Sequence, residues 1–595
     1  MLETVGMSGF NQQRSAMHCG RRTRVHLVVL IALLLTGAVG VPSASGKVSV
    51  FPSPGTPVAS ETTSFSFRGV KPAQLGPVKI VGSVSGRHGI ARRVRHSDGH
   101  GVSLVPKRRF ADGEVVRIRT HRKIRLARHG DFRIRIGRFT GGSKKTSHAL
   151  RPPKKGLRSR PDLKLPRIKV ARTSAMEAPG DYFLGFRNSG LTILDNLGRV
   201  TWFKPTAFGF NNFEPQTLDG RPVLTYFRTP TPNRDGAYVI LNRHYRKVAE
   251  VTPGNGYKAD MHEFHLTGRG TALILAYRTV RWDLRAVGGP ADGPVADCVV
   301  QEIDLKTGAV LFEWHAVGNI GLRRSRERRH GPGSWDAFHL NSVEPDGKAL
   351  LVSSRWTSSI YRVGRASGQV NWVLRGDGGR SDFKVGRAAR FAAQHDVRRL
   401  PNGEISLFDN AGVPGRRVAS VLILKLEGKG RGRRAVKVAR YRNPDGEASA
   451  ATGGAEVLPD GNVLAGWGNS ASLTEFSPEG KVLFHARQGS SSYRARKSEW
   501  DGIPNGRPAI TSMRGKHGPV VVFASWNGAG NIARWDVLTG PDPDHLTVAG
   551  SADWRNLETE IPVASANGKV QVVAVGEDGQ ELGRSALVPV GRRSR

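Results

Sequence analysis

The sequence predicts an all-β protein in which a six-bladed β-propeller is flanked by an N-terminal and a C-terminal β-sandwich. Turns containing glycine recur along the chain, with 73 glycines among 595 residues, as in proteins built of many short strands. One strand-turn pattern returns at a regular spacing through the middle of the chain. No long stretch shows the period of an amphipathic helix, which argues against helical domains.

The first 46 residues have the layout of a secretion signal. Arg21, Arg22 and Arg24 precede an apolar stretch over 25–41, and small residues follow at 43–46. A basic start, an apolar centre and a small-residue cleavage region are the three parts of a signal peptide. We therefore expect a secreted or cell-surface protein, with an uncleaved membrane anchor as the alternative.

The chain has two cysteines, and Cys19 lies inside the expected signal. Cys298 would then be the one cysteine of the mature chain. This excludes an intramolecular disulfide and a cysteine zinc site, so stability must come from apolar burial.

Residues 47–140 are expected to form a small β-sandwich. Its stretches 115–119 and 132–136 alternate apolar residues with arginine, which is typical of a sheet with one solvated face. Residues 141–165 follow as a basic linker that is rich in lysine and proline and poor in apolar residues.

The formal net charge of +42 has two interpretations. The one we favour is arginine spread over solvated faces; the other is a polyanionic cell-surface polymer as partner. The arginines of 87–169 lack the regular interleaving with aromatic residues that a platform for single-stranded nucleic acid would require. We expect no nucleic-acid partner.

Residues 166–500 contain an internal repeat, which predicts the propeller. Its clearest mark, Gly-x-Val-x-(Trp/Phe), begins at Gly198, Gly308, Gly368 and Gly480. The middle interval is roughly half of the other two, so two more units are expected in degenerate form, near 244–248 and 432–436. Six units of four short strands each describe propeller blades.

A second mark supports the same register. Every unit after the first has a turn that ends in glycine, at Gly220, Gly270, Gly347, Gly403 and Gly461. For the first unit we expect its four strands at 168–172, 182–186, 191–195 and 200–203. Residues 507–590 form a third all-β segment that resembles a fibronectin type III module.

Three histidines occupy one structural position of the repeat. Counting eight residues back from the turn glycines of three consecutive units gives His262, His339 and His395. The position starts the first strand of each blade, which is the innermost strand of a propeller. We therefore expect the three imidazoles to converge at one mouth of the central channel. Asp396 is expected to point away from them and to contact backbone.

The segments around these histidines resemble the signatures of the arylsulfotransferase family. They are Asp260–Phe264, Phe338–Val343, Ser353–Arg355, Gln394–Val397 and Pro401–Gly403. The resemblance covers the propeller and implies that His395 is the nucleophile that becomes sulfurylated, while His262, His339 and Arg355 hold the sulfate oxygens. It also implies an aryl sulfate donor, a phenolic acceptor and neither cofactor nor nucleotide. One departure is His-Glu at 262–263, where the third segment has His-Asp.

These residue types suit sulfuryl transfer. Neutral imidazole is both a nucleophile and a leaving group near pH 7, and a guanidinium offers a planar fork of donors for oxyanions.

Three other functions stay open: a zinc site of the three histidines, a quinone-cofactor dehydrogenase, and a non-enzymatic cell-surface binding propeller. Arg355 argues against the zinc site because a guanidinium beside a dication is repelled, and six units argue against the dehydrogenase, whose propellers usually have eight.

Overall fold

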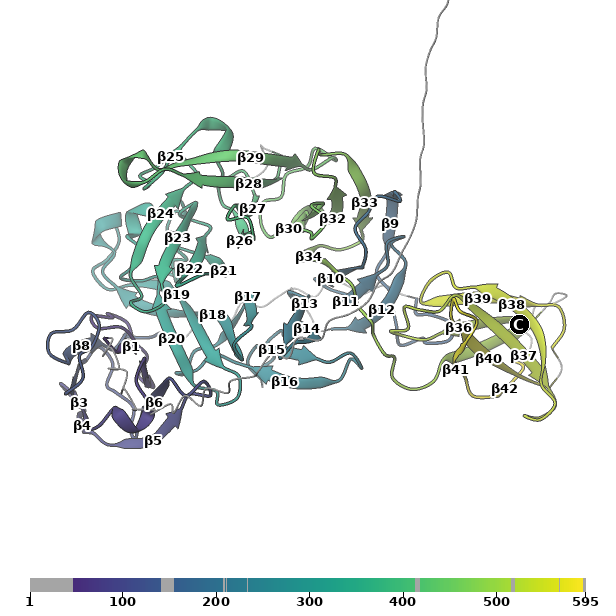
Figure 1. Cartoon of the computed structure of the whole chain (residues 1–595), viewed down its shortest axis with the longest axis horizontal. Helices are drawn as coiled ribbons and strands as arrows, with labels where there is room; N and C mark the ends of the chain where they lie inside the picture. Colours follow the sequence, from purple (N-terminus) through teal and green to yellow (C-terminus); the bar gives the residue numbers. More distant parts are fainter. Residues whose placement is uncertain are drawn as a thin grey trace, which may run out of the picture. The chain divides into compact units, whose positions relative to one another are not determined.

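The structure is a computed structural model, and it describes residues 47–140, 155–206, 209, 211–232, 234–412, 418–514, 520–566 and 568–591. Within these residues the all-β prediction is confirmed: strands alternate only with short 3₁₀ turns (Figure 1). None of the described helical turns is long and apolar enough to cross a membrane. The expected secretion signal at 1–46 and the linker part at 141–154 lie outside the described residues.

Two four-stranded sheets make up residues 47–140. The first has the strand order β1 (Ser49–Phe51), β2 (Phe65–Arg68), β6 (Gly101–Pro106), β5 (Ile90–Arg95); the second has the order β4 (Gly86–His88), β3 (Val78–Gly82), β7 (Val115–Thr120), β8 (Asp131–Arg135). Their apolar side chains share one core that includes Phe67, Leu104 and Ile118. Along β7, Val116 and Ile118 are buried while Arg117 and Arg119 face outward, so the expected solvated face is present.

Six sheets then follow in chain order, antiparallel except for one short parallel strand in the fifth. The first has β34 (Ser492–Ser498), β10 (Asp181–Phe186), β11 (Gly190–Leu194) and β12 (Val200–Pro205); the second β13 (Glu214–Leu218), β14 (Arg221–Arg228), β15 (Ala237–Leu241) and β16 (Lys247–Val251); the third β17 (Ala259–Thr267), β18 (Thr271–Trp282), β19 (Gly293–Asp304) and β20 (Val310–His315). The fourth has β21 (Leu340–Asp346), β22 (Ala349–Ser354), β23 (Ser359–Gly364) and β24 (Val370–Arg375); the fifth β26 (His395–Arg399), β27 (Ile405–Asp409), β28 (Ser420–Glu427), β29 (Arg434–Arg442) and the parallel β25 (Lys384–Val385); the sixth β30 (Gly454–Val457), β31 (Val463–Gly466), β32 (Ser472–Phe476), β33 (Val482–Gln488) and β9 (Ile168–Arg172). The 3₁₀ turns of the described residues are η1 (Pro72–Gln74), η2 (Arg285–Val287), η3 (Leu322–Arg324), η4 (Arg387–Ala389), η5 (Gly430–Gly432) and η6 (Gly468–Ser470).

The inner strands of these sheets form a closed series. β13 contacts β17, and contacts continue to β21, β26, β30 and β34, which returns to β13 (Figure 1). The glycine turns expected between the first and second strands of five sheets lie where the sequence predicts them. All five glycines have positive φ, for example 74° at Gly220 and 84° at Gly403, a conformation that glycine adopts at no steric cost.

The expected strand set of the first unit is wrong in one strand. Residues 168–172 form β9, which pairs with β33 at the outer edge of the sixth sheet. The innermost strand of the first sheet is β34, which pairs with β10. The chain therefore closes its ring by exchanging strands between its two ends, and pairing of both ends satisfies sheet edges that would otherwise stay open.

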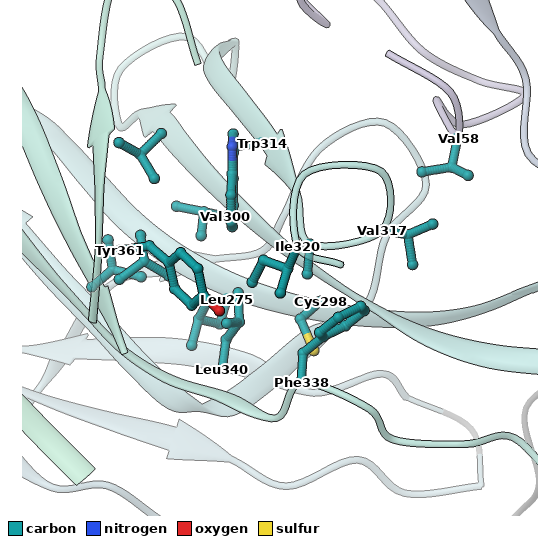
Figure 2. Packing of buried hydrophobic residues seen from close by; sticks show 14 of the residues in the cluster. Val58, Leu275, Cys298, Val300, Trp314, Val317, Ile320, Phe338, Leu340 and Tyr361 are labelled. Atoms are coloured by element: carbon teal, nitrogen blue, oxygen red, sulfur yellow. The ribbon is translucent and has the colours of Figure 1, made fainter. Parts of the chain in front are cut away.

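Apolar side chains fill the space between neighbouring sheets. Leu275, Val300 and Trp314 of the third sheet pack with Leu340 and Tyr361 of the fourth (Figure 2). Cys298 lies in the same cluster as a free, fully buried thiol. Because apolar area is removed from water at each such junction, adjacent sheets stabilise one another.

The C-terminal residues form two further sheets. The first has the order β35 (Ala509–Arg514), β36 (Val520–Ser525), β39 (Glu558–Val563); the second has the order β38 (Thr547–Asp553), β37 (Arg534–Gly540), β40 (Lys569–Val575), β41 (Glu581–Arg584), with β42 (Val588–Pro589) on β40. Trp535 is fully buried in the core that they share.

Candidate active site

The structure brings together all four residues that the sequence singles out. The rings of His262 and His339 have centroids 4.8 Å apart, and the ring of Tyr493 lies 5.5 Å from His262 and 6.4 Å from His395. The backbone N–H of Arg355 donates to the carbonyl of His339 at 3.1 Å. Three imidazoles and one guanidinium thus share a single site at the start of the inner strands.

A local irregularity of the inner strands places each histidine. The pairing register shifts between Ala259 and Phe264 in β17, between Leu340 and Ser342 in β21, and between His395 and Arg398 in β26. His262 lies within the first of these bulges, His339 directly before the second, and His395 begins the third. A bulge re-aims side chains beside it, and bulges are frequent next to active sites.

A neutral amide fixes the ring of His395. Its Nδ1 lies 2.7 Å from Oδ1 of Asn410. The amide nitrogen of Asn410 donates to the carbonyls of Ser449 and Thr452 at 2.8 and 2.9 Å, so its oxygen must be the atom that faces His395. Nδ1 of His395 therefore carries the proton and donates it, which leaves the lone pair on Nε2.

Carboxylates hold the other two histidines. Nδ1 of His262 lies 2.5 Å from Oδ1 of Asp260, and Nδ1 of His339 lies 2.5 Å from Oδ2 of Asp336. Each aspartate also accepts the backbone N–H of its own histidine, at 2.9 and 3.1 Å. A carboxylate on Nδ1 orients the ring and stabilises the imidazolium when Nε2 takes up a proton.

The electrostatics of the site keep His395 uncharged. Burial lowers the pKa of His395 well below its ordinary value, and the charge of Arg355 lowers it further. Burial also lowers the pKa of His339, although Asp336 opposes this effect. His395 is 1% exposed, so it is a buried neutral base beside a permanent cation.

Arg355 is anchored but keeps donors for an anion. Its Nη2 donates to the carbonyl of Ala450 at 2.6 Å, and its guanidinium carbon lies 4.0 Å from the ring centroid of Trp356. Its buried Nε has no hydrogen-bond partner among the described residues. A planar cation with spare N–H groups beside three imidazoles is suited to bind a tetrahedral oxyanion.

Asp396 has a different role from its neighbour His395. Its carboxylate accepts the backbone N–H of Ala455 at 2.9 Å and two hydrogen bonds from Arg496, each 2.8 Å. Asp396 therefore contacts backbone as predicted, and in addition it takes part in a buried ionic network.

Sequence reasoning missed four residues of the site: Asp260, Asp336, Asn410 and Tyr493. An acidic residue shortly before His262 and before His339 is a signal that could have identified the first two. Asn410 and Tyr493 have no such signal, because strand pairing and ring closure bring them in from distant positions. Among the described residues, no group of three or more His, Cys, Asp or Glu side chains could hold a metal ion.

Comparison with known proteins gives one family. Residues 214–489, which include all four predicted site residues, match the family described as Arylsulfotransferase (ASST). No curated protein matches the chain.

Several solved structures overlap with the fold at low identity. A protein of unknown function from Bacteroides caccae is 14% identical with a TM-score of 0.34, covering 54% of this chain and 99% of its own. A hydrazine synthase from Kuenenia stuttgartiensis is 15% identical with a TM-score of 0.28, covering 57% and 81%. The apo form of AztD from Citrobacter koseri is 10% identical with a TM-score of 0.25, covering 70% and 96%. Overlap this weak gives no information about the chemistry of the site.

Proposed function

Because the chain belongs to the arylsulfotransferase family through its residues 214–489, we propose that it transfers a sulfuryl group from an aryl sulfate ester to a phenol through a covalent intermediate on His395. The family makes the chain a sulfotransferase in general terms. The donor, the acceptor, the intermediate and the independence from a nucleotide are the proposal.

The fixed tautomer of His395 is the observation that carries the proposal. A nucleophilic imidazole needs a lone pair on the nitrogen that faces the substrate, and Asn410 holds the proton on the other nitrogen. The low pKa of His395 keeps that lone pair free of protons at neutral and mildly acidic pH. An activated nucleophile beside oxyanion donors is the arrangement that covalent group transfer requires.

In the first half-reaction, Nε2 of His395 attacks the sulfur of the donor. A nitrogen–sulfur bond forms, and the bond between sulfur and the aryl oxygen breaks with its electron pair on the phenolate. His262 or His339, when it carries a proton on Nε2 and its Nδ1 is held by an aspartate, gives the phenolate that proton. Arg355 binds the equatorial oxygens, where charge collects as in the related phosphoryl transfer.

In the second half-reaction, the oxygen of an acceptor phenol attacks the sulfur on His395. One of the two aspartate-bound imidazoles takes the phenolic proton, and the nitrogen–sulfur bond breaks with its electron pair on Nε2. Nδ1 keeps its proton throughout because Oδ1 of Asn410 accepts a hydrogen bond from it. The sulfurylated ring is therefore cationic, which makes it a good leaving group.

The finer description of the molecule belongs to the same proposal. We interpret the six sheets as blades of a β-propeller, which the closed series of contacts between inner strands supports. The terminal sheet pairs are then β-sandwiches, the C-terminal one fibronectin III-like. Export to the cell surface, inferred from residues 1–46, remains a prediction.

The decisive test is to trap the intermediate. Purified protein is treated with 4-nitrophenyl sulfate without nucleotide or phenol, and peptides are mapped by mass spectrometry under alkaline conditions. We expect one sulfuryl group on His395, its transfer when phenol is added, and ping-pong kinetics. His395→Ala should abolish adduct and transfer, while exposed His244→Ala is the control.

Three kinds of result would contradict this proposal. Transfer retained by His395→Ala, or an adduct on another residue, would refute the role of His395. Stoichiometric zinc in the active protein, with loss of activity on chelation, would favour the three-histidine metalloenzyme instead. A protein with neither transfer activity nor metal would be the non-enzymatic binding propeller.

A further inference from the structure

The outward face of the sheet β4-β3-β7-β8 is strongly cationic. Alternation along these strands buries every second side chain and turns the others toward solvent. The outward side chains include six cations, at Lys79, Arg87, Arg117, Arg119, Arg133 and Arg135. The one carboxylate among them is Asp131, which pairs with both Arg117 and Arg119. Six cations and one carboxylate leave a net charge of +5 on this face.

The strand register places like charges directly opposite each other. Arg117 is the cross-strand partner of Arg133, and Arg119 is the partner of Lys79. Like charges in directly opposed positions destabilise a sheet. The fold itself does not need these pairs, since neutral β-branched residues would suit an exposed strand position better. A ligand of opposite charge would turn this unfavourable arrangement into a favourable one.

The same face holds a groove. A hollow of about 450 Å³ is lined by the cations Lys79, Arg117, Arg119 and Arg133 and by Val81, Gly82, Ser83 and Val115. Val81 and Val115 are half-buried and supply an apolar surface between the charges. The lining contains no aromatic side chain, so it offers no surface on which nucleic-acid bases could stack.

We propose that this face binds a linear polyanion in which phosphodiester groups alternate with polyol units. Neighbouring strands lie about 4.8 Å apart, and outward residues of one strand follow each other at about 6.7 Å. The cations therefore form a lattice that matches a chain with one phosphate per short repeat unit. The two valines can contact the methylene groups between the phosphates. This contact requires neither bases nor aromatic rings.

The proposal predicts binding that depends on charge at this face alone. The probe is poly(glycerol phosphate), titrated into the full-length protein at several salt concentrations. In the variant Arg117→Thr/Arg119→Thr/Arg133→Thr we expect affinity to fall by about tenfold or more, and the slope of log K against log salt to fall by about two, as loss of three phosphate contacts predicts. Threonine keeps the β-propensity of the strands, and thermal unfolding verifies that the variant folds.

A matched control separates this face from net charge. Arg92→Thr/Arg93→Thr/Arg95→Thr removes the same charge from β5, which lies in the other sheet of the sandwich and is exposed. It should change the affinity less than threefold, a difference well under 1 kcal/mol. Equal losses in both variants would overturn the proposal, because binding would then follow overall charge. Tighter binding of a single-stranded oligonucleotide with equal phosphate content would overturn it in favour of nucleic acid.

Discussion

At the scale of single residues, the three histidines differ in the partner of Nδ1. His262 and His339 face carboxylates, which favour the charged ring, whereas His395 faces an amide, which cannot compensate a positive charge. Environments that separate the proton affinities of like groups are how active sites divide acid and base roles. The division here assigns nucleophilic attack to His395 and proton transfer to the other two.

Exchange of the amide for a carboxylate tests this division. In Asn410→Asp the new carboxylate would accept the Nδ1 proton and stabilise the imidazolium, so the pKa of His395 should rise. Because protonated His395 is no nucleophile, the acid limb of kcat/KM should move to higher pH, which a pH-rate profile measures. Asp336→Asn is the control: it should lower turnover and leave that limb in place. An unmoved limb in Asn410→Asp would refute the assignment.

The residues of the site divide according to how the sequence encodes them. His262, His339 and His395 could be predicted because the repeat places them at equivalent positions, and one offset from a turn glycine finds all three. Asn410 follows the second strand of its sheet, so it meets His395 through hairpin pairing, and no spacing rule of the repeat identifies it. Such pairing partners can be predicted only when the strand register is known, and a single sequence does not determine the register.

At the scale of elements, the ring depends on a strand from the far end of the chain. The repeat predicts four consecutive strands per sheet, and five sheets contain such a set, although the fifth and sixth each carry one additional strand. The first sheet does not, since β34 replaces the expected strand at 168–172. Both segments alternate in the manner of a strand, so local pattern cannot distinguish them. Closure of the ring decides which segment joins the first sheet, because it pairs strands from both ends of the chain.

Arg494 of β34 should therefore be critical for stability. It is fully buried and donates to Glu214 at 2.9 Å and to Glu263 at 3.2 Å, on the inner strands of the next two sheets. Arg494→Met would remove one of the two arginines that pair with each of these carboxylates, the others being Arg496 and Arg398. Loss of one partner of a buried ion pair typically costs about 3–5 kcal/mol. Urea unfolding should show this loss, whereas exposed Arg442→Met should be nearly neutral. A loss below about 1 kcal/mol would mean that the other arginines compensate.

At the scale of the whole molecule, all six inner strands contribute to one buried ionic network. Its members are the arginines Arg398, Arg494 and Arg496 and the acids Glu214, Glu263, Glu344, Asp396 and Glu456. Five acids face three arginines, and burial raises the pKa of both Glu344 and Glu456 to about 7. Protonation of these two balances the charges, so the network is neutral under mildly acidic conditions.

The raised pKa values of these two carboxyls make the free energy of unfolding depend on pH with a defined sign. Unfolded glutamate has a pKa of 4.5, against about 7 in the folded protein, so the folded state holds more protons between these values. The unfolding free energy should therefore fall as pH rises through this window, by up to about 1.4 kcal/mol per unit of pKa difference for each group.

Glutamine cannot ionise and still accepts the hydrogen bonds from Lys497 and Arg398. Relative to the parent, Glu344→Gln/Glu456→Gln should gain stability as pH increases from about 5 to about 7.5, whereas exposed Glu560→Gln/Glu577→Gln should not. Urea titrations at several pH values measure both differences, and parallel curves for parent and network variant would show that the acids are already ionised at pH 5.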